Sequence, residues 1–373
     1  MLNELRQPRA LVFANGKPVS GLVDFEVENN TFYQADTFRV QLALSNQPKE
    51  TDFAFWAGQK KITLEVYAGF PRDAENYTKA ELELLITGEC DDIEINPVRD
   101  EIVLSGRDFT NRLIDSQTSE KFQNETSSQI VEKIAKRHGL DAKVKATKAK
   151  VGTYYANEKA SLTKRQSEWD LITWLAEREG YSVYIKGNTL YFQPKIADSE
   201  KPFVIKWTAP DKETASWQID TVDISFSRTL TLAKDIIVIV NSYDPKTKKK
   251  ISVKRTATQT KNTKNAGEAQ PVGDAQQYVF YKPNLTVQDA EKLAESRLRE
   301  ISSHQVKMSC EMPADNALQT ENLIQVTGTG TAFDQTYYPD KITRTFSVDR
   351  GYVMHIEAKN HEPESQVSME TSE

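Results

Sequence analysis

Alternating apolar and polar residues dominate the first hundred positions of the chain. The alternation is clearest at 24–28, 38–44 and 61–67, where every second side chain is apolar. A period of two predicts strands that bury one face. Asn15-Gly16 is a typical hairpin turn, and regular short strands with turn signals favour a barrel or a sandwich. The pattern predicts an antiparallel β-domain over residues 1–107.

A helical period replaces this alternation after residue 108. Thr126 or Ser127 can cap a first helix, and Ser167 can cap a second one, which stops at Gly180. A short hairpin follows the second helix. Residues 108–195 are therefore expected to form a compact α/β domain inserted after the first β-domain.

The chain returns to strand periodicity at about residue 196. Residues 235–243 are almost continuously apolar, which predicts a central strand. Thr286 caps a well-signalled helix. We expect residues 196–243 and 305–363 to form a second β-domain, 244–304 an inserted basic loop plus helix, and 364–373 a flexible tail. The fold class predicted is α+β, mainly β, with two tube-like antiparallel β-barrel domains, an α/β insert domain and a smaller inserted segment.

Composition agrees with several small domains. The chain has 373 residues, a hydrophobic fraction of 38% and a formal net charge of −6, which suits β-domains that bury one face or complete their cores in an oligomer. A nucleic-acid binder would more often be basic. Cys90 and Cys310 lie too far apart to suggest a disulfide framework. We see no secretory signal and no apolar run of membrane-spanning length, so folding in a cytoplasm without membrane insertion is expected.

The sequence offers little catalytic or metal-binding chemistry. Ser105 lacks the Gly-x-Ser-x-Gly frame of a nucleophile elbow. The histidines are expected to be structural or surface residues, and no His-Glu-x-x-His or zinc-spaced cysteine pair accompanies them. They are His138, His304, His355 and His361. Neither an enzyme nor a cofactor or metal site is predicted.

Two other groups are interpreted as turns. Glu89, Asp91 and Asp92 are expected to lie in a connection between strands, because aspartate is a common turn residue. An acid/base pair would need a cleft that sequence cannot show. Gly328-Thr329-Gly330 lacks a third glycine and a following helix, so it predicts a hairpin turn instead of a phosphate-binding loop.

A basic segment is the remaining candidate site. Between residues 244 and 264 many cations face a single acid, Asp244. This pattern is typical of a solvated hairpin, and the functional alternative is contact with phosphates or with an acidic partner. Base stacking is not supported, because no aromatic residue occurs between Tyr243 and Tyr278. The possible contact residues are Lys246, Lys248, Lys249, Lys250, Lys254 and Arg255.

Three segments together resemble the late control protein D family, the baseplate hub proteins of contractile phage tails. The first is 88–108, a strand pair that ends in Ser-Gly-Arg-Asp. The second is 167–184, a capped helix with Leu-Ala-Glu-Arg-Glu-Gly before an aromatic strand. The third is 324–353, which is similar to the family's last strands. The length suits Mu-like hubs, and the same fold occurs in the N-terminal region of VgrG-type spikes.

The resemblance implies a structural part, not an enzyme. Family members have two tube-like barrels per subunit, and three subunits form a ring that adapts a sixfold tail tube to a threefold cell-puncturing spike. The expected partners are two further copies of the chain, the tube protein, a separate spike protein and other baseplate proteins. DNA would pass only as cargo. The expected location is the virion, after assembly in the host bacterial cytoplasm.

Several alternatives stay open at this point. A hub of a tailocin or of a type VI-like secretion machine would share the fold. A tail-associated cell-wall hydrolase would need two carboxylates in a cleft. A receptor- or carbohydrate-binding tail protein would present aromatic loops, for which Tyr154-Tyr155 and Tyr337-Tyr338 are the candidates.

Overall fold

The computed structural model describes residues 7–31, 33–148, 150–151, 166–194, 201–208, 218–228, 236–244, 248–257, 276–302 and 306–360. Within these ranges the protein is α+β and mainly β, as predicted, and fourteen strands belong to one sheet. None of the described helices is both long and apolar enough to cross a membrane.

The first β-unit covers residues 9–108. It consists of β1 (Arg9–Ala14), β2 (Lys17–Pro18), β3 (Leu22–Asn30), β4 (Thr37–Ala43), α1 (Phe53–Ala57), β5 (Thr63–Gly69), β6 (Glu83–Asn96) and β7 (Glu101–Asp108), with 3₁₀ turns at Lys49–Thr51 and Lys79–Glu81. β6 belongs to two layers, because residues 83–89 pair with β5 and residues 88–96 pair with β7. The core between the layers includes Val40, Leu64 and Leu104.

The second β-unit repeats this arrangement. It consists of β15 (Phe203–Thr208), β16 (Gln218–Ile219), β17 (Asp223–Arg228), β21 (Val306–Pro313), β22 (Ile324–Thr327), β23 (Thr336–Ser347) and β24 (Gly351–Asn360). The sheet order β22–β23–β24–β21–β17 matches β5–β6–β7–β4–β3 of the first unit. The matched strands also follow each other along the chain in the same order, so the two units are built alike without a clear sequence repeat.

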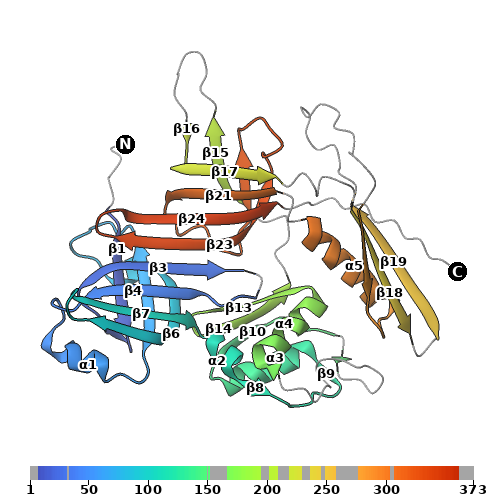
Figure 1. Ribbon diagram of the computed structural model, residues 1–373, viewed down its shortest axis with the longest axis horizontal. Helices are drawn as coiled ribbons and strands as arrows, with labels where there is room; N and C mark the ends of the chain where they lie inside the picture. The colour runs from blue at the N-terminus through green and yellow to red at the C-terminus, as the bar shows by residue number, and fades with distance from the viewer. Residues whose placement is uncertain are drawn as a thin grey trace.

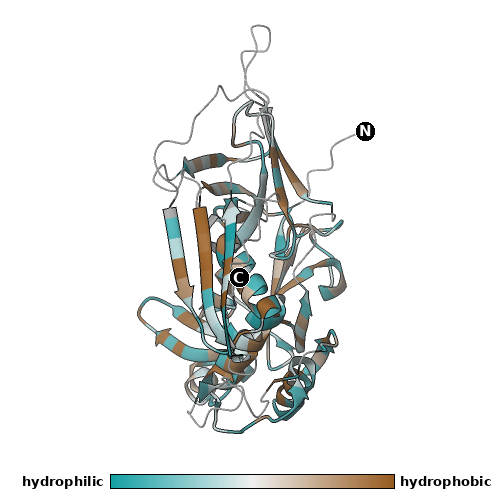
Figure 2. Cartoon of the chain, turned by 90° about the vertical axis from the view of Figure 1, so that its right-hand side faces the viewer, coloured by the Kyte–Doolittle hydropathy of each residue, from teal (hydrophilic) through white to brown (hydrophobic). Residues whose placement is uncertain are grey.

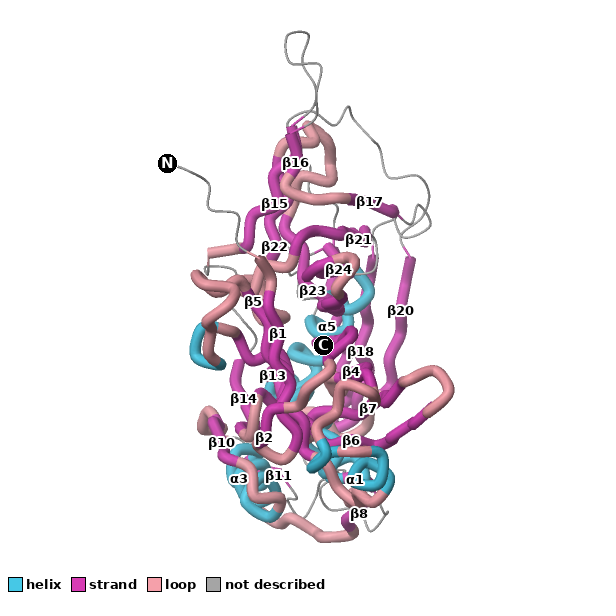
Figure 3. The backbone as a smooth tube through the Cα atoms, turned by 90° about the vertical axis from the view of Figure 1, so that its left-hand side faces the viewer, coloured by secondary structure: helices cyan, strands magenta, loops and turns pink. Residues whose placement is uncertain are grey.

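The α/β unit lies between them in the chain. It consists of α2 (Thr110–Asp115), β8 (Gln117–Thr118), β9 (Glu125–Thr126), α3 (Ser127–Arg137), β10 (Asp141–Val144), β11 (Lys150–Val151), β12 (Gln166–Ser167), α4 (Glu168–Glu179), β13 (Tyr181–Lys186) and β14 (Thr189–Pro194). The Thr126 and Ser167 side chains cap α3 and α4, and Gly180 ends α4 at φ 71°. α3 lies at the same end of the molecule as α1, far from β15 and β16 (Figure 3).

A fourth unit contains β18 (Ile236–Asp244), β19 (Lys249–Ala257), β20 (Gln276–Tyr281) and α5 (Val287–Ser302). β18 is a central strand, as its apolar sequence predicts. It pairs with β19 and β20, however, and with no strand described for the second β-unit, in which the sequence predicts it. Its apolar side chains are explained by α5, which packs Ala290, Ala294 and Leu298 against this small sheet. Figure 2 shows the sheet from the side opposite α5.

Candidate assembly surfaces

The two β-units are joined edge to edge within one chain. β3 pairs antiparallel with β23, from Asn30 opposite Lys341 to Asp24 opposite Ser347. Phe25 stacks on Phe346 across this pair, with ring centroids 5.8 Å apart. Figure 1 shows the result as a ladder of strands that descends from β17 through β21, β24, β23, β3, β4 and β7 to β6. The junction therefore makes one sheet from two similar units.

A buried arginine holds the core side of this junction. Arg344 of β23 is only 1% exposed. Its guanidinium donates from Nη1 to Asn29 Oδ1 at 2.8 Å and from Nη2 to the Leu318 carbonyl. Asn29 in turn donates to the Asp36 carboxylate at 2.8 Å. Burial lowers the pKa of Arg344. The chain of hydrogen bonds links β23 of the second unit to β3 and the following loop of the first.

Two acids lie at the end of this network. Asp36 accepts a further hydrogen bond from the Asn30 backbone at 2.7 Å, and Asp108 accepts two from Thr110, at 2.9 and 3.1 Å. Burial raises the pKa of Asp36 to about 7, and burial together with the charge of Asp36 raises the pKa of Asp108. Both line a small pocket where the α/β unit, through Tyr184, meets both β-units.

The opposite face of the ladder is polar. Alternate residues of its strands point away from the core, and among the charged ones acids outnumber bases. The acids are Asp24, Glu26, Glu28, Asp92, Glu94, Glu101, Asp223, Glu311 and Glu357, and the bases are Arg39, Arg107, Lys307, Lys341 and Lys359. Neighbouring strands are bridged by ion pairs such as Arg39–Asp24 at 3.2 Å and Lys341–Glu28 at 3.1 Å. We call this surface the polar sheet face.

The predicted basic segment forms a strand instead of a loop over most of its described length. β19 pairs antiparallel with β18. Lys248, Lys249 and Lys250 are exposed, and Lys254 is partly buried. Alternate residues of a strand face opposite sides, and Arg255 lies on the side that faces α5. It is only 4% exposed. Its side chain is therefore not available to a phosphate on the surface of the chain. Lys246 lies outside the described residues.

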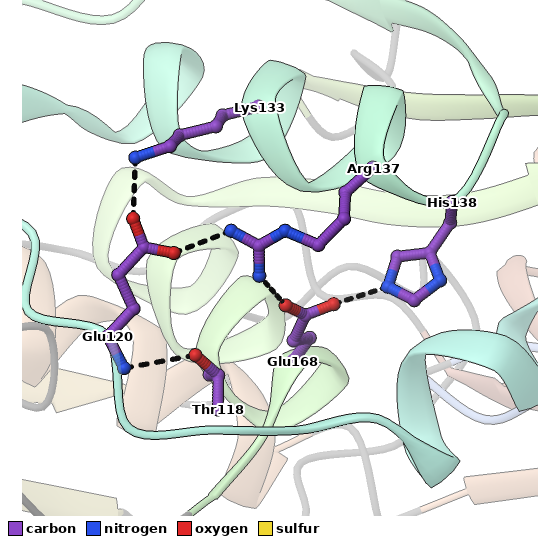
Figure 4. Close-up of polar contacts among 6 residues, drawn as sticks. All are labelled: Thr118, Glu120, Lys133, Arg137, His138 and Glu168. Carbon is purple, nitrogen blue, oxygen red and sulfur yellow. Dashed lines mark hydrogen bonds and ion pairs between the residues drawn. The ribbon is translucent and has the colours of Figure 1, made fainter.

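The α/β unit is held together by a separate ionic network (Figure 4). Glu168, at the first turn of α4, has a side chain only 3% exposed and contacts both Arg137 and His138 at the end of α3. Arg137 also binds Glu120 at 2.5 Å, and Lys133 binds the same carboxylate at 2.5 Å. An acid at a helix N-terminus and cations at a helix C-terminus are each favoured by the helix dipole. His138 is therefore a structural residue, as expected.

Replacing Glu168 by glutamine should lower the stability of the chain by about 1–2 kcal/mol, because a charge-assisted contact is exchanged for a neutral one. Urea unfolding followed by circular dichroism measures the change. Glu132→Gln, an exposed position on α3, serves as the matched control and should change stability by less than about 0.5 kcal/mol. Equal effects of the two substitutions would contradict the role assigned to Glu168.

The expectation that Glu89, Asp91 and Asp92 form a turn is wrong. All three lie inside β6, which continues to Asn96. The register of β6 shifts between Cys90 and Asp92, so a β-bulge at Asp91 accommodates the acidic run without ending the strand. Arg107 of β7 donates to the Asp91 carboxylate at 2.7 Å.

His355 and residues 328–330 are the remaining histidine and glycine candidates in the described part of the chain. His355 Nε2 lies 3.2 Å from Ser309 Oγ and 3.9 Å from Glu357, and the described residues contain no group of three metal ligands. Residues 328–330 lie in the turn between β22 and β23. His304, His361 and Tyr154-Tyr155 fall outside the described residues.

Sequence inspection missed the polar groups of the junction between the two β-units. Asp108 ends the Ser-Gly-Arg-Asp segment that carried the family resemblance, so a signal was present, but its role was not recognised. Asp36 and Arg344 carry no local signal. Asp36 binds Asn29 and Asn30 at the end of the preceding strand, and Arg344 reaches Asn29 only through the pairing of β3 with β23.

Solved structures share this fold along nearly the whole chain. A tail protein from Neisseria meningitidis MC58 aligns with a TM-score of 0.66 at 13% identity, covering 95% of this chain and 97% of that one. The 43 kDa tail protein of prophage MuSo2 from Shewanella oneidensis aligns with a TM-score of 0.65 at 14% identity, covering 94% and 98%. The E. coli c3393 protein, a component of the type VI secretion system, aligns with a TM-score of 0.54 at 13% identity, covering 96% and 79%.

No curated protein sequence matches the chain. The model of one protein family, described as the phage tail baseplate hub (GPD), matches residues 77–349, which is most of the chain. That stretch includes the end of the first β-unit, the α/β unit, the fourth unit and the second β-unit as far as β23, and it ends before β24. The resemblance to the late control protein D family is thereby confirmed, and the chain belongs to the phage tail baseplate hub family.

Proposed function

We propose that three copies of this chain form the ring of a contractile-tail baseplate hub, which adapts a sixfold tail tube to a threefold spike. The observation that carries the proposal is the duplication, since two β-units with one strand order stand side by side in a single sheet. Three such chains supply six similar units to the tube and three identical chains to the spike. In this proposal the chain acts by binding its neighbours through interfaces, and no catalytic step is assigned to it.

The polar sheet face is proposed to line the lumen of this ring. Its excess of carboxylates would repel the phosphates of passing DNA, and repulsion prevents the long-lived contacts that a basic surface would make. The outer surfaces would meet the tail tube protein, the spike protein and other baseplate proteins. The exposed lysines of β19 are proposed to contact an acidic surface on one of these partners. The ring would be assembled in the host cytoplasm and carried in the virion.

Light scattering on the purified chain tests the proposal. The expected mass is three times the 42.3 kDa of one subunit. The physical reason is that the sheet ends in edges without a neighbouring strand among the described residues, and a closed ring would cover these edges. A stable monomer at micromolar concentration would count against a self-assembling ring.

Two alternatives differ in their support. A hub of a tailocin or of a secretion machine is favoured by the similarity to the E. coli secretion component, and it would use the same ring. A cell-wall hydrolase would need an acid pair open to substrate. Asp36 and Asp108 do not suit this, because both carboxyl groups already accept hydrogen bonds from the protein within the junction. A turbidity assay on purified peptidoglycan separates the hydrolase from the hub.

A further inference from the structure

Two strand edges of the large sheet have no neighbour in the described part of the chain. β17 pairs with β21 on one side only. β6 pairs with β5 only through residues 83–89, so the same edge of residues 91–96 is left without a strand. Exposed edges with apolar side chains invite pairing with another chain. These two edges therefore require an explanation.

The internal duplication shows what each edge corresponds to. β17 occupies the place of β3, and β6 occupies the place of β23. The match extends to detail, because β6 has its bulge at Asp91 and β23 has one at Asp340. Asp108 and Asn360, which end the equivalent strands β7 and β24, are both buried polar residues. The two units can therefore be compared residue by residue.

Within the chain, the counterparts of the two free edges pair with each other. β3 pairs with β23 just beyond the bulge at Asp340. We propose that β17 of one chain pairs antiparallel with β6 of a neighbouring copy, just beyond the bulge at Asp91, and so repeats the β3–β23 junction between subunits. The inference rests on the proposed function for the presence of a neighbouring copy. It adds which strands meet and in which register.

The register follows from the equivalent positions. Glu28 pairs with Thr343 at the junction within the chain. Ser227 corresponds to Glu28, because each holds the same place in the ladder with the next strand. Glu94 corresponds to Thr343, because each is the third residue after its bulge. Ser227 of one copy should therefore lie opposite Glu94 of the next, and the same reasoning places Ser225 opposite Asn96.

The burial of side chains agrees with a missing neighbour at both edges. Phe25 and Val27 of β3 are 1% and 0% exposed at the junction within the chain. Their counterparts on β17, Ile224 and Phe226, are only partly buried. Val222, beside β17, is 69% exposed. A neighbouring β6 would cover these side chains, as β23 covers those of β3.

The apolar residues of β6 complement this edge. Ile93 and Ile95 point to the core side and are only partly buried. The proposed register sets Ile95 opposite Phe226, in the way that Arg344 lies opposite Val27 within the chain. Val98, which is 94% exposed in the turn after β6, would lie opposite Asp223 and next to Val222. An apolar contact would thus replace the buried arginine network at the junction between subunits.

Cysteine cross-linking tests the register in the full-length chain. A Ser227→Cys/Glu94→Cys variant changes two residues of the polar sheet face and should form covalent dimers and trimers under mild oxidation. Directly opposed Cβ atoms lie about 4.5–5.5 Å apart, whereas diagonal ones lie about 7–8 Å apart. The off-register control Ser227→Cys/Asn96→Cys should therefore cross-link about 10-fold more slowly. Each single variant controls for Cys90 and Cys310, and non-reducing gels separate bonds between chains from bonds within one.

The outcomes separate this inference from the proposed function. A second in-register pair, Ser225→Cys/Asn96→Cys, covers the case in which the first variant does not fold. Cross-linking of the in-register pairs above the off-register control supports the pairing. If the particle has the mass of a trimer but neither in-register pair cross-links faster than the off-register control, the proposed strand pairing is wrong. The proposed trimeric ring would still stand. A monomer of the unmodified chain overturns both.

Discussion

Replacing Arg344 by alanine is expected to lower the free energy of unfolding by about 3–5 kcal/mol. The substitution leaves Asn29 Oδ1 and the Leu318 carbonyl without their donor, and it opens a cavity where a fully buried side chain had been. It also removes a positive charge that lowers the pKa of Asp36. Chemical denaturation followed by circular dichroism measures the loss.

Arg39→Ala is the matched control for this change. Arg39 lies on the neighbouring strand β4, is about half exposed and binds Asp24 on the polar sheet face, so its loss should cost less than about 1 kcal/mol. A double-mutant cycle of Arg344 with Asn29 should give a coupling of about 0.5–3 kcal/mol. A loss no larger than that of Arg39→Ala, with no coupling, would show that the network does not hold the junction.

Replacing Asp108 by asparagine is expected to stabilise the chain at neutral pH by about 1–3 kcal/mol. The pKa of Asp36 is raised to about 7, and that of Asp108 is raised as well. Between about pH 4 and pH 7 the unfolded chain has released protons that the folded chain still holds, so stability falls as pH rises through this window. The asparagine side chain does not titrate, so only one of the two acids remains. Stability should therefore decline less steeply as pH rises.

Thermal unfolding at a series of pH values between 4 and 8 checks this expectation. Asn360 holds the equivalent place in the second β-unit, which shows that an amide fits this position of the ladder. Asp92→Asn on the exposed polar sheet face is the control and should leave the slope unchanged. A variant that loses stability equally at every pH would contradict the assignment of the pH dependence to the buried pair.

Local signals in the sequence predicted the individual elements well. Thr126 and Ser167 accept the capping hydrogen bonds expected of them, and Gly180 ends α4 in the left-handed conformation. These features depend on residues within one turn of the chain, so neighbouring positions are sufficient to recognise them. The acidic run at Asp91 misled the prediction, because a β-bulge and a turn favour similar residues and differ only in what the partner strand does.

The candidate surfaces could be predicted only in part. The family resemblance indicated a hub, and the matching family model confirms the family. The lysines of β19 were correctly seen as a basic group, but the buried position of Arg255 depends on the helix that covers its side of the strand. β18 was assigned to the wrong group of strands for a related reason. An almost continuously apolar sequence indicates that both faces of a strand are covered. It does not identify the sheet to which the strand belongs.

The sequence by itself determined most strands and helices, the caps of α3 and α4, the mainly β class and the family of this chain. Only the tertiary structure decided that β3 pairs with β23, that Asn29 joins Arg344 to Asp36, and that the edges of β17 and β6 have no neighbouring strand among the described residues. Element formation depends on local backbone preferences and on the period of apolar residues. Pairing between strands hundreds of residues apart depends on hydrogen bonds and packing that exist only once the chain has folded.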